Sequence, residues 1–176
     1  MSESTPAPRS SHAVCQLTGQ WRDRQYLLHG HGHGPDAPVS QPPPLVVQLH
    51  GRGIDATRFD WWTGFSGLAD EAGFLLAMPE AVGERWNDGR QIGPTQEIDD
   101  VGFLAAVIED VGARLPVDRT RVYLVGMSNG AAMAGRFACA AGCNGPSDHA
   151  GQPCSALGES ESTLKRQRSV TRCRRA

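Results

Sequence analysis

The chain has 176 residues, of which 39% are hydrophobic, and its formal net charge is −2. Length and composition are those of a single soluble domain with a core of its own. No stretch approaches the ~18 consecutive apolar residues of a membrane span, and the polar N-terminal segment lacks the apolar centre of a signal peptide. We therefore expect no membrane partner, and no export signal is visible.

The structured part is expected to begin with an antiparallel hairpin. Residues 1–11 are polar and rich in Pro and Ser, which predicts disorder. Candidate strands at 12–17 and 22–29 flank a short Gly-containing turn. The connector at 30–44 follows, and histidines alternate near its start at His29, His31 and His33. A glycine-spaced loop of this kind is a poor ligand set, so we expect an exposed loop and no metal.

Strands and helices alternate from residue 45 to residue 139, which predicts βαβ units. The expected strands are almost entirely apolar, as in strands buried on both faces, and lie at 45–49, 74–78 and 122–125. One helix is expected at 60–72, ending at Gly73. A second is capped by Asp99 or Asp100, and a third follows residue 128. The predicted fold class is α/β, with a mostly parallel sheet and flanking helices.

Gly126-Met127-Ser128-Asn129-Gly130 joins the last predicted strand to the last predicted helix. A G-x-S-x-G sequence in this context is typical of a nucleophile elbow. The serine on such a sharp turn has a strained backbone, and side chains two residues before and after it would clash. The helix dipole also favours negative charge developing near the serine. We therefore predict that Ser128 is a catalytic nucleophile and not part of a Gly-rich turn.

His50-Gly51-Arg52-Gly53 follows the strand at 45–49 and resembles the oxyanion loop of α/β-hydrolases. The resemblance implies that the backbone amides of Arg52 and Asn129 form an oxyanion hole. His50 precedes the serine, which is the wrong place in the chain for the general base. We expect it to be a strand-end histidine that is hydrogen-bonded to the next loop.

Five segments in chain order resemble the polyhydroxybutyrate-depolymerase-like esterases, a group that is also similar to feruloyl and acetyl-xylan esterases. They are PLVVQLHG at 44–51, LADEAGF at 68–74, DDVGF at 99–103, VDRTRVY at 117–123 and GMSNG at 126–130. The resemblance covers about residues 17–139. It implies an extracellular α/β-hydrolase that cleaves polymer or plant-wall esters without a cofactor. It also places 84–87 near the substrate, so Trp86 is either a substrate-binding residue or packed within its loop.

The acid and the base of a catalytic triad are not identifiable in the sequence. Both should follow the serine, yet the only later histidine is His149, and its neighbour Asp148 would point away from it on an extended segment. Residues 141–176 contain no strand-like apolar run, and their last twelve residues carry six Lys and Arg and no acid. We expect a partial α/β-hydrolase domain at 12–140 and a disordered basic tail at 141–176. The family-like reading frame would end near Cys139.

Two functions remain open. The first is a serine esterase that acts on a polyester oligomer or a plant-wall ester through an acyl-enzyme. The alternative is a catalytically inactive hydrolase-like fragment that lacks the triad Asp and His. The five cysteines fit no zinc spacing. The tip of the basic tail lacks the aromatic residues of single-strand nucleic-acid binding, so no nucleic-acid partner is expected.

Overall fold

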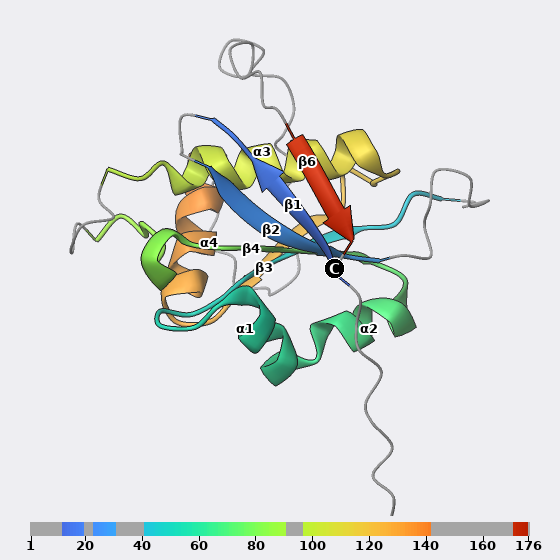
Figure 1. The fold of residues 1–176 in the computed structure, drawn as a ribbon, viewed down its shortest axis with the longest axis horizontal. Coiled ribbons are helices and arrows are strands. Elements are labelled where there is room, and N and C mark those ends of the chain that lie inside the picture. Colours follow the sequence, from blue (N-terminus) through green and yellow to red (C-terminus); the bar gives the residue numbers. More distant parts are fainter. Residues whose placement is uncertain (1–11, 20–22, 31–40, 91–96, 142–170, 176) are drawn as a thin grey trace, which may run out of the picture.

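The computed structural model describes residues 12–19, 23–30, 41–90, 97–141 and 171–175. In these residues six strands form one sheet of order β5-β3-β4-β2-β1-β6, with helices on both faces (Figure 1). The strands are β1 (Ala13–Leu17), β2 (Arg24–His29), β3 (Leu45–Leu49), β4 (Leu75–Pro79), β5 (Val122–Gly126) and β6 (Thr171–Arg175). The helices are α1 (Ala56–Thr63), α2 (Phe65–Ala72), α3 (Asp100–Arg114) and α4 (Asn129–Ala140), with a 3₁₀ turn η1 at Val82–Glu84.

The sheet has a parallel part and an antiparallel part. β3 runs parallel to both β4 and β5, and helices connect these strands on either side of the sheet. β2 pairs antiparallel with β4 and with β1, where Cys15 lies opposite Tyr26. The predicted hairpin and the predicted helix-covered parallel strands are therefore both confirmed.

Apolar side chains of the sheet alternate between two cores. On β4, Leu75 and Ala77 pack on the face covered by α3 and α4, whereas Leu76 and Met78 pack on the face covered by α1 and α2. This alternation is the period of two that an extended chain dictates. Because both faces are covered, the central strands are apolar almost throughout, as the sequence indicated.

The helix predicted at 60–72 is two helices. α1 begins at Ala56, where Asp55 accepts a hydrogen bond from the Arg58 N–H, and it ends at Gly64 in the left-handed conformation with φ 66°. The carboxylate of Asp60 then accepts hydrogen bonds from the N–H and the hydroxyl of Ser66 in the first turn of α2. Glycine ends helices in this way because the left-handed conformation costs it little.

The tail predicted to be disordered contains one strand. β6 pairs antiparallel with β1, while residues 142–170 lie outside the described part of the chain. An outer strand presents unpaired N–H and C=O groups to any extended segment, whatever its side chains. The absence of an apolar run in the tail was therefore an insufficient reason to exclude a strand.

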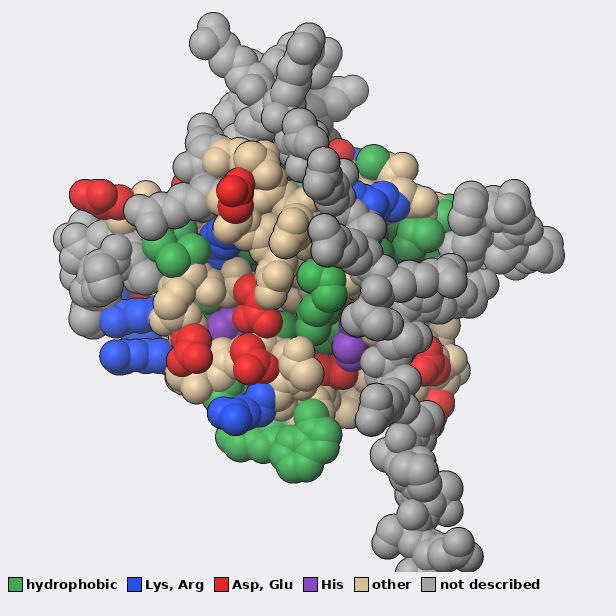
Figure 2. Space-filling view, viewed as in Figure 1, with side chains coloured by type: hydrophobic (Ala, Val, Ile, Leu, Met, Phe, Trp, Pro, Cys, Tyr) green, Lys and Arg blue, Asp and Glu red, His purple; other side chains and the backbone are tan. Residues whose placement is uncertain are grey.

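Large apolar side chains are exposed on α1 and α2. Trp61 is 79% exposed and Trp62 59%, whereas Trp86 is completely buried. In Figure 2, apolar side chains protrude at the lower edge of the molecule, where Figure 1 places α1. Burial therefore divides the described tryptophans into an exposed pair and one core residue.

A buried ion pair joins β2 to the start of α3. Arg24 Nη1 lies 2.5 Å from Asp100 Oδ1, and the two side chains are 3% and 0% exposed. The guanidinium also donates to the Glu80 carbonyl and lies 3.7 Å from the centre of the Phe103 ring. Burial lowers the pKa of Arg24, and the adjacent carboxylate of Asp100 opposes that shift. The pair stays ionic because each charge has a partner.

We predict that Arg24→Met lowers the free energy of unfolding by about 3–5 kcal/mol, because it leaves the Asp100 charge buried and unpaired. Combining it with Asp100→Leu should recover much of the loss. The matched control is Arg119→Ala, which breaks an ion pair with Glu109 whose side chains are 50% and 40% exposed; it should cost less than about 1 kcal/mol. Urea denaturation measures all three variants, and equal losses for the two single variants would contradict the prediction.

Candidate active site

Ser128 occupies a strained turn between β5 and α4. Its φ is 53° and its ψ is −114°, a backbone conformation that residues other than glycine rarely adopt. The residue is exposed and its hydroxyl does not cap α4. The tight strand-to-helix turn expected from the sequence is therefore present, with the serine at its apex.

Both flanking glycines are required by close backbone contacts. A Cβ atom on Gly126 would lie 2.6 Å from the carbonyl carbon of Gly130, and one on Gly130 would lie 2.5 Å from the carbonyl oxygen of His50. Real Cβ atoms do not approach other atoms this closely. The two positions thus allow the turn to pack against itself and against the end of β3.

The loop at 50–53 lies beside the serine turn. β3 and β5 are neighbours with Leu49 opposite Gly126, and the Met127 N–H donates to the Leu49 carbonyl at 3.3 Å. The turns that follow these two parallel strands therefore meet at the same edge of the sheet. This edge is where ligands bind in open α/β sheets.

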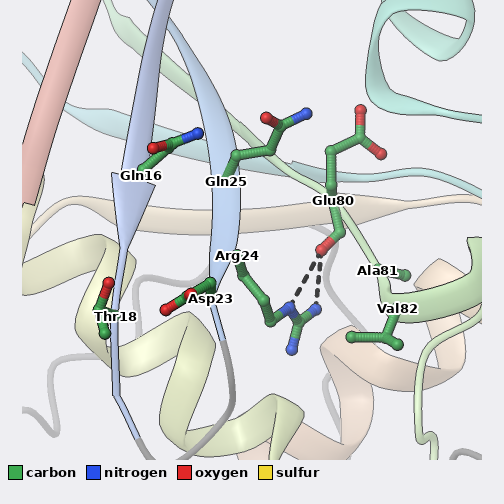
Figure 3. Close-up of a pocket in the computed structure, with 8 residues that line it drawn as sticks. All are labelled: Gln16, Thr18, Asp23, Arg24, Gln25, Glu80, Ala81 and Val82. Carbon is green, nitrogen blue, oxygen red and sulfur yellow. Dashed lines mark hydrogen bonds between the residues drawn. The ribbon is translucent and has the colours of Figure 1, made fainter.

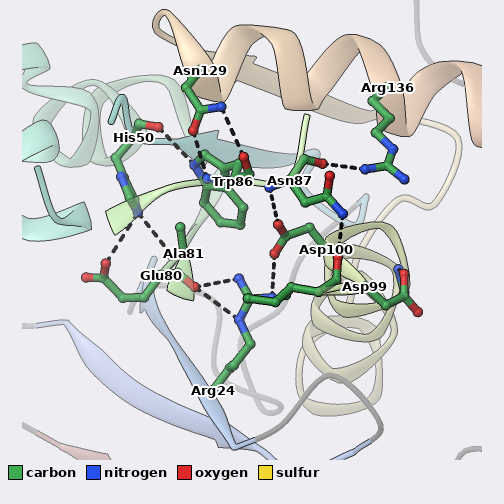
Figure 4. A network of polar contacts seen from close by, with 12 residues as sticks. Arg24, His50, Glu80, Ala81, Trp86, Asn87, Asp99, Asp100, Asn129 and Arg136 are labelled. Carbon is green, nitrogen blue, oxygen red and sulfur yellow. Dashed lines mark hydrogen bonds and ion pairs between the residues drawn. The ribbon is translucent and has the colours of Figure 1, made fainter. Parts of the chain in front are cut away.

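The side chain of Asn129 holds the segment after η1 against the serine turn. Its Oδ1 accepts a hydrogen bond from the Trp86 N–H at 2.7 Å, and its Nδ2 donates to the Trp86 carbonyl at 3.1 Å and to Asp88 Oδ2 at 2.7 Å (Figure 4). Hydrogen bonds from Arg90 and from Asn129 hold the pKa of Asp88 at about 2, so its carboxylate stays charged. The carboxamide of Asn129 thus makes three hydrogen bonds, which hold the first residue of α4 against this segment.

Trp86 is a core residue, and the prediction that it binds substrate is wrong in this structure. Its side chain is 0% exposed, and its indole Nε1–H donates to the His50 carbonyl at 2.9 Å. Next to it, the Asn87 N–H donates to Asp100 Oδ2 at 2.5 Å. A large apolar ring whose N–H has a buried acceptor is stable in the interior. The alternative interpretation, packing within the loop, is the one the structure supports.

His50 is buried with both ring nitrogens engaged. The Ala81 N–H donates to Nε2 at 3.1 Å, and the Glu80 carboxylate lies 3.5 Å from the same nitrogen. Nδ1 donates to the Gly51 carbonyl at 2.8 Å, because a carbonyl oxygen can only accept. A ring fixed in this way cannot take a proton from Ser128. The expected strand-end role is therefore the one observed.

The described histidines supply no base for Ser128. His12 and His29 lie near Asp60 and Asp70, on the side of the sheet covered by α1 and α2. His31, His33, His149 and Asp148 lie outside the described residues. In the part of the chain that the structure describes, no group of three or more His, Cys, Asp or Glu side chains could hold a metal ion, and no helix is long and apolar enough to cross a membrane.

A pocket of about 460 Å³ lies away from the serine, beside the Arg24 guanidinium and its hydrogen bonds to the Glu80 carbonyl (Figure 3). Its lining comes from β1, β2 and the segment after β4: Gln16, Thr18, Asp23, Arg24, Gln25, Glu80, Ala81 and Val82. Because Ser128 does not line it, this pocket is separate from the candidate site.

Sequence reasoning missed the buried polar residues that support the site. The sequence predicts that either Asp99 or Asp100 caps the helix. Asp99 is the cap, through the Gly102 N–H, and Asp100 forms an ion pair with Arg24. Two adjacent acids at the start of one helix were the available signal for this ion pair.

We predict that Gly130→Ala lowers the free energy of unfolding by at least about 2 kcal/mol, because the new methyl group overlaps the end of β3. Gly135→Ala is the control on the same helix, since a Cβ there meets nothing within 4 Å; it should stabilise the protein by up to about 1 kcal/mol. Thermal or urea unfolding distinguishes the two. A tolerated Gly130→Ala would show that the turn can open without cost.

A family model and two curated relatives match most of the chain. The family described as Esterase PHB depolymerase matches residues 33–172, further than the limit near residue 139 that the sequence motifs predicted. The putative esterase NocK of Nocardia uniformis subsp. tsuyamanensis is 32% identical over 139 residues, covering 77% of this chain and 40% of NocK. Feruloyl esterase B of Neurospora crassa is 28% identical over 127 residues, covering 69% of this chain and 42% of that protein.

Solved structures share the fold at lower identity. An S-formylglutathione hydrolase from Agrobacterium tumefaciens has a TM-score of 0.55 at 16% identity, covering 77% of this chain and 55% of that one. The native structure of pOPH has a TM-score of 0.54 at 19% identity, covering 77% and 50%. The chain thus spans about two fifths of the length of the curated relatives and about half that of these structures. It has the α/β-hydrolase fold and belongs to the Esterase PHB depolymerase family.

Proposed function

We propose that this chain carries the nucleophile and the oxyanion hole of a serine hydrolase that cleaves carboxylic esters. The observation that carries the proposal is the strained, exposed Ser128 at the start of α4, directly beside the loop at 50–53. Strained residues of this kind persist where the surrounding structure fixes them, and they occur most often at functional sites.

The reaction would proceed by acyl transfer in two steps. Ser128 Oγ attacks the ester carbonyl carbon and gives its proton to a general base, which does not come from the described histidines. The backbone amides of Arg52 and Asn129 donate to the resulting oxyanion, and the alcohol leaves with a proton, so that an acyl-enzyme forms. Water then attacks the acyl-enzyme, which releases the acid and restores the serine.

The family supports esters of polymers or of plant-wall acids as the substrate class. The family description refers to PHB depolymerase, and one relative is a feruloyl esterase. The buried, doubly engaged His50 favours the second candidate, an inactive hydrolase-like chain, unless a residue outside the described part supplies the base.

We predict that a fluorophosphonate probe labels this chain at Ser128 and that Ser128→Ala abolishes the labelling. The reason is that phosphonylation needs a serine activated by a general base, with an oxyanion hole beside it; the proposal assigns the serine and the hole to this turn, and labelling would show that a base completes them. Mass spectrometry of the labelled peptide identifies the site, and hydrolysis of p-nitrophenyl butyrate measures turnover. The unfolding temperature of Ser128→Ala must match that of the wild type, since a loss of fold would also remove the label. Absence of labelling in a folded wild-type chain would favour the inactive alternative.

A further inference from the structure

We propose that the imidazole of His50 acts as a positioning group that sets the direction of the Arg52 N–H. The use of that N–H as an oxyanion donor rests on the proposed function. Its direction, in contrast, is a property of the folded backbone and can be measured without any reaction.

The argument begins with the peptide unit between Gly51 and Arg52. The described chain contains no cis peptide bond, so the Gly51 carbonyl and the Arg52 N–H point in opposite directions. The Gly51 carbonyl is drawn towards His50 Nδ1, 2.8 Å away, and the imidazole is 0% exposed. The Arg52 N–H is therefore turned away from the buried ring, on a residue whose own side chain is exposed.

The tautomer of His50 is essential to this effect. The Gly51 carbonyl can only accept, so Nδ1, 2.8 Å away, carries a hydrogen. Nε2 faces the Ala81 N–H at 3.1 Å and the Glu80 carboxylate at 3.5 Å. With the hydrogen on Nε2 alone, Nδ1 could no longer donate to the Gly51 carbonyl. The segment after β4 thus holds Nε2 through the Ala81 amide and the Glu80 carboxylate (Figure 4), while Nδ1 holds the loop.

The residues on either side of Arg52 are held as well. The Trp86 indole donates to the His50 carbonyl at 2.9 Å, and its ring lies 5.2 Å from the imidazole. On the other side, the Gly53 N–H donates to the Glu84 carbonyl at 3.1 Å. The Arg52 N–H has no acceptor among the described residues. It is an unpaired donor on a loop whose neighbouring groups are fixed, as an oxyanion hole requires.

Two substitutions separate positioning from simple packing. The amide nitrogen of His50→Asn can lie near the place of Nδ1 and donate to the Gly51 carbonyl, whereas the amide of His50→Gln reaches the place of Nε2 and cannot. Both remove the buried ring, so both should lower stability. Backbone ¹⁵N relaxation measures the order parameter of the Arg52 N–H. We expect about 0.85 in the wild type and in His50→Asn, and below about 0.6 in His50→Gln. An Arg52 N–H that stays rigid in His50→Gln would overturn the proposal.

The wild type provides a test that needs no variant. Long-range ¹H–¹⁵N spectra should show the hydrogen of His50 on Nδ1, and the Arg52 N–H should be as ordered as the strands. The absence of a hydrogen on Nδ1, or a mobile Arg52 N–H in the wild type, would also contradict the proposal, even if both His50 variants failed to fold.

The labelling rate distinguishes this inference from the proposed function. The maximal rate of fluorophosphonate labelling should fall about 100-fold in His50→Gln, with the probe concentration at half-maximal rate unchanged, and should be largely retained in His50→Asn. No labelling of a folded wild type would refute the proposed function, while the order parameters would still decide the role of His50. Labelling of His50→Gln at the wild-type rate would refute the role of His50 alone.

Discussion

The two hydrogen bonds between the Asn129 carboxamide and the backbone of Trp86 connect the serine turn to the rest of the molecule. Through them, Asn129 at the start of α4 binds the segment that follows η1. The Trp86 indole in that segment donates a hydrogen bond to the His50 carbonyl. One further residue along, Asn87 binds Asp100, which is paired with Arg24 on β2. The polar network therefore runs from Arg24 on β2 to Asn129, the residue after Ser128 (Figure 4).

This network explains how a strained serine can persist. Residues in sparsely populated backbone conformations cost about 1–3 kcal/mol and remain only where the surroundings fix them. At Ser128 the surroundings are two close backbone contacts at the flanking glycines and the clamped side chain of Asn129. Every charge deep in the network has a partner, since Asp100 faces Arg24 and the nearby Asp88 receives bonds from Asn129 and Arg90. The result is a strained turn that is held on both sides.

The sequence predicted the elements that follow from local rules. Apolar runs located β3, β4 and β5, helical spacing located α3, and the glycine pattern located the turn at Ser128. It could not locate the break at Gly64 or the strand β6, since these depend on a left-handed residue and on a free strand edge. It left the role of Trp86 open between substrate binding and packing, and it missed the pairing of Arg24 with Asp100, because this pair brings together residues distant in the chain. Contacts of this kind leave no periodic trace in a single sequence.

The central claim is that Ser128 and the amides of Arg52 and Asn129 form one preorganised site. A structure of the chain with a phosphonate bound to Ser128 tests this claim most directly. We expect the phosphonyl oxygen to lie about 2.7–3.1 Å from the amide nitrogens of Arg52 and Asn129, with the loop at 50–53 unmoved. A phosphonyl oxygen that points to solvent, or a loop that must rearrange to reach it, would contradict the account.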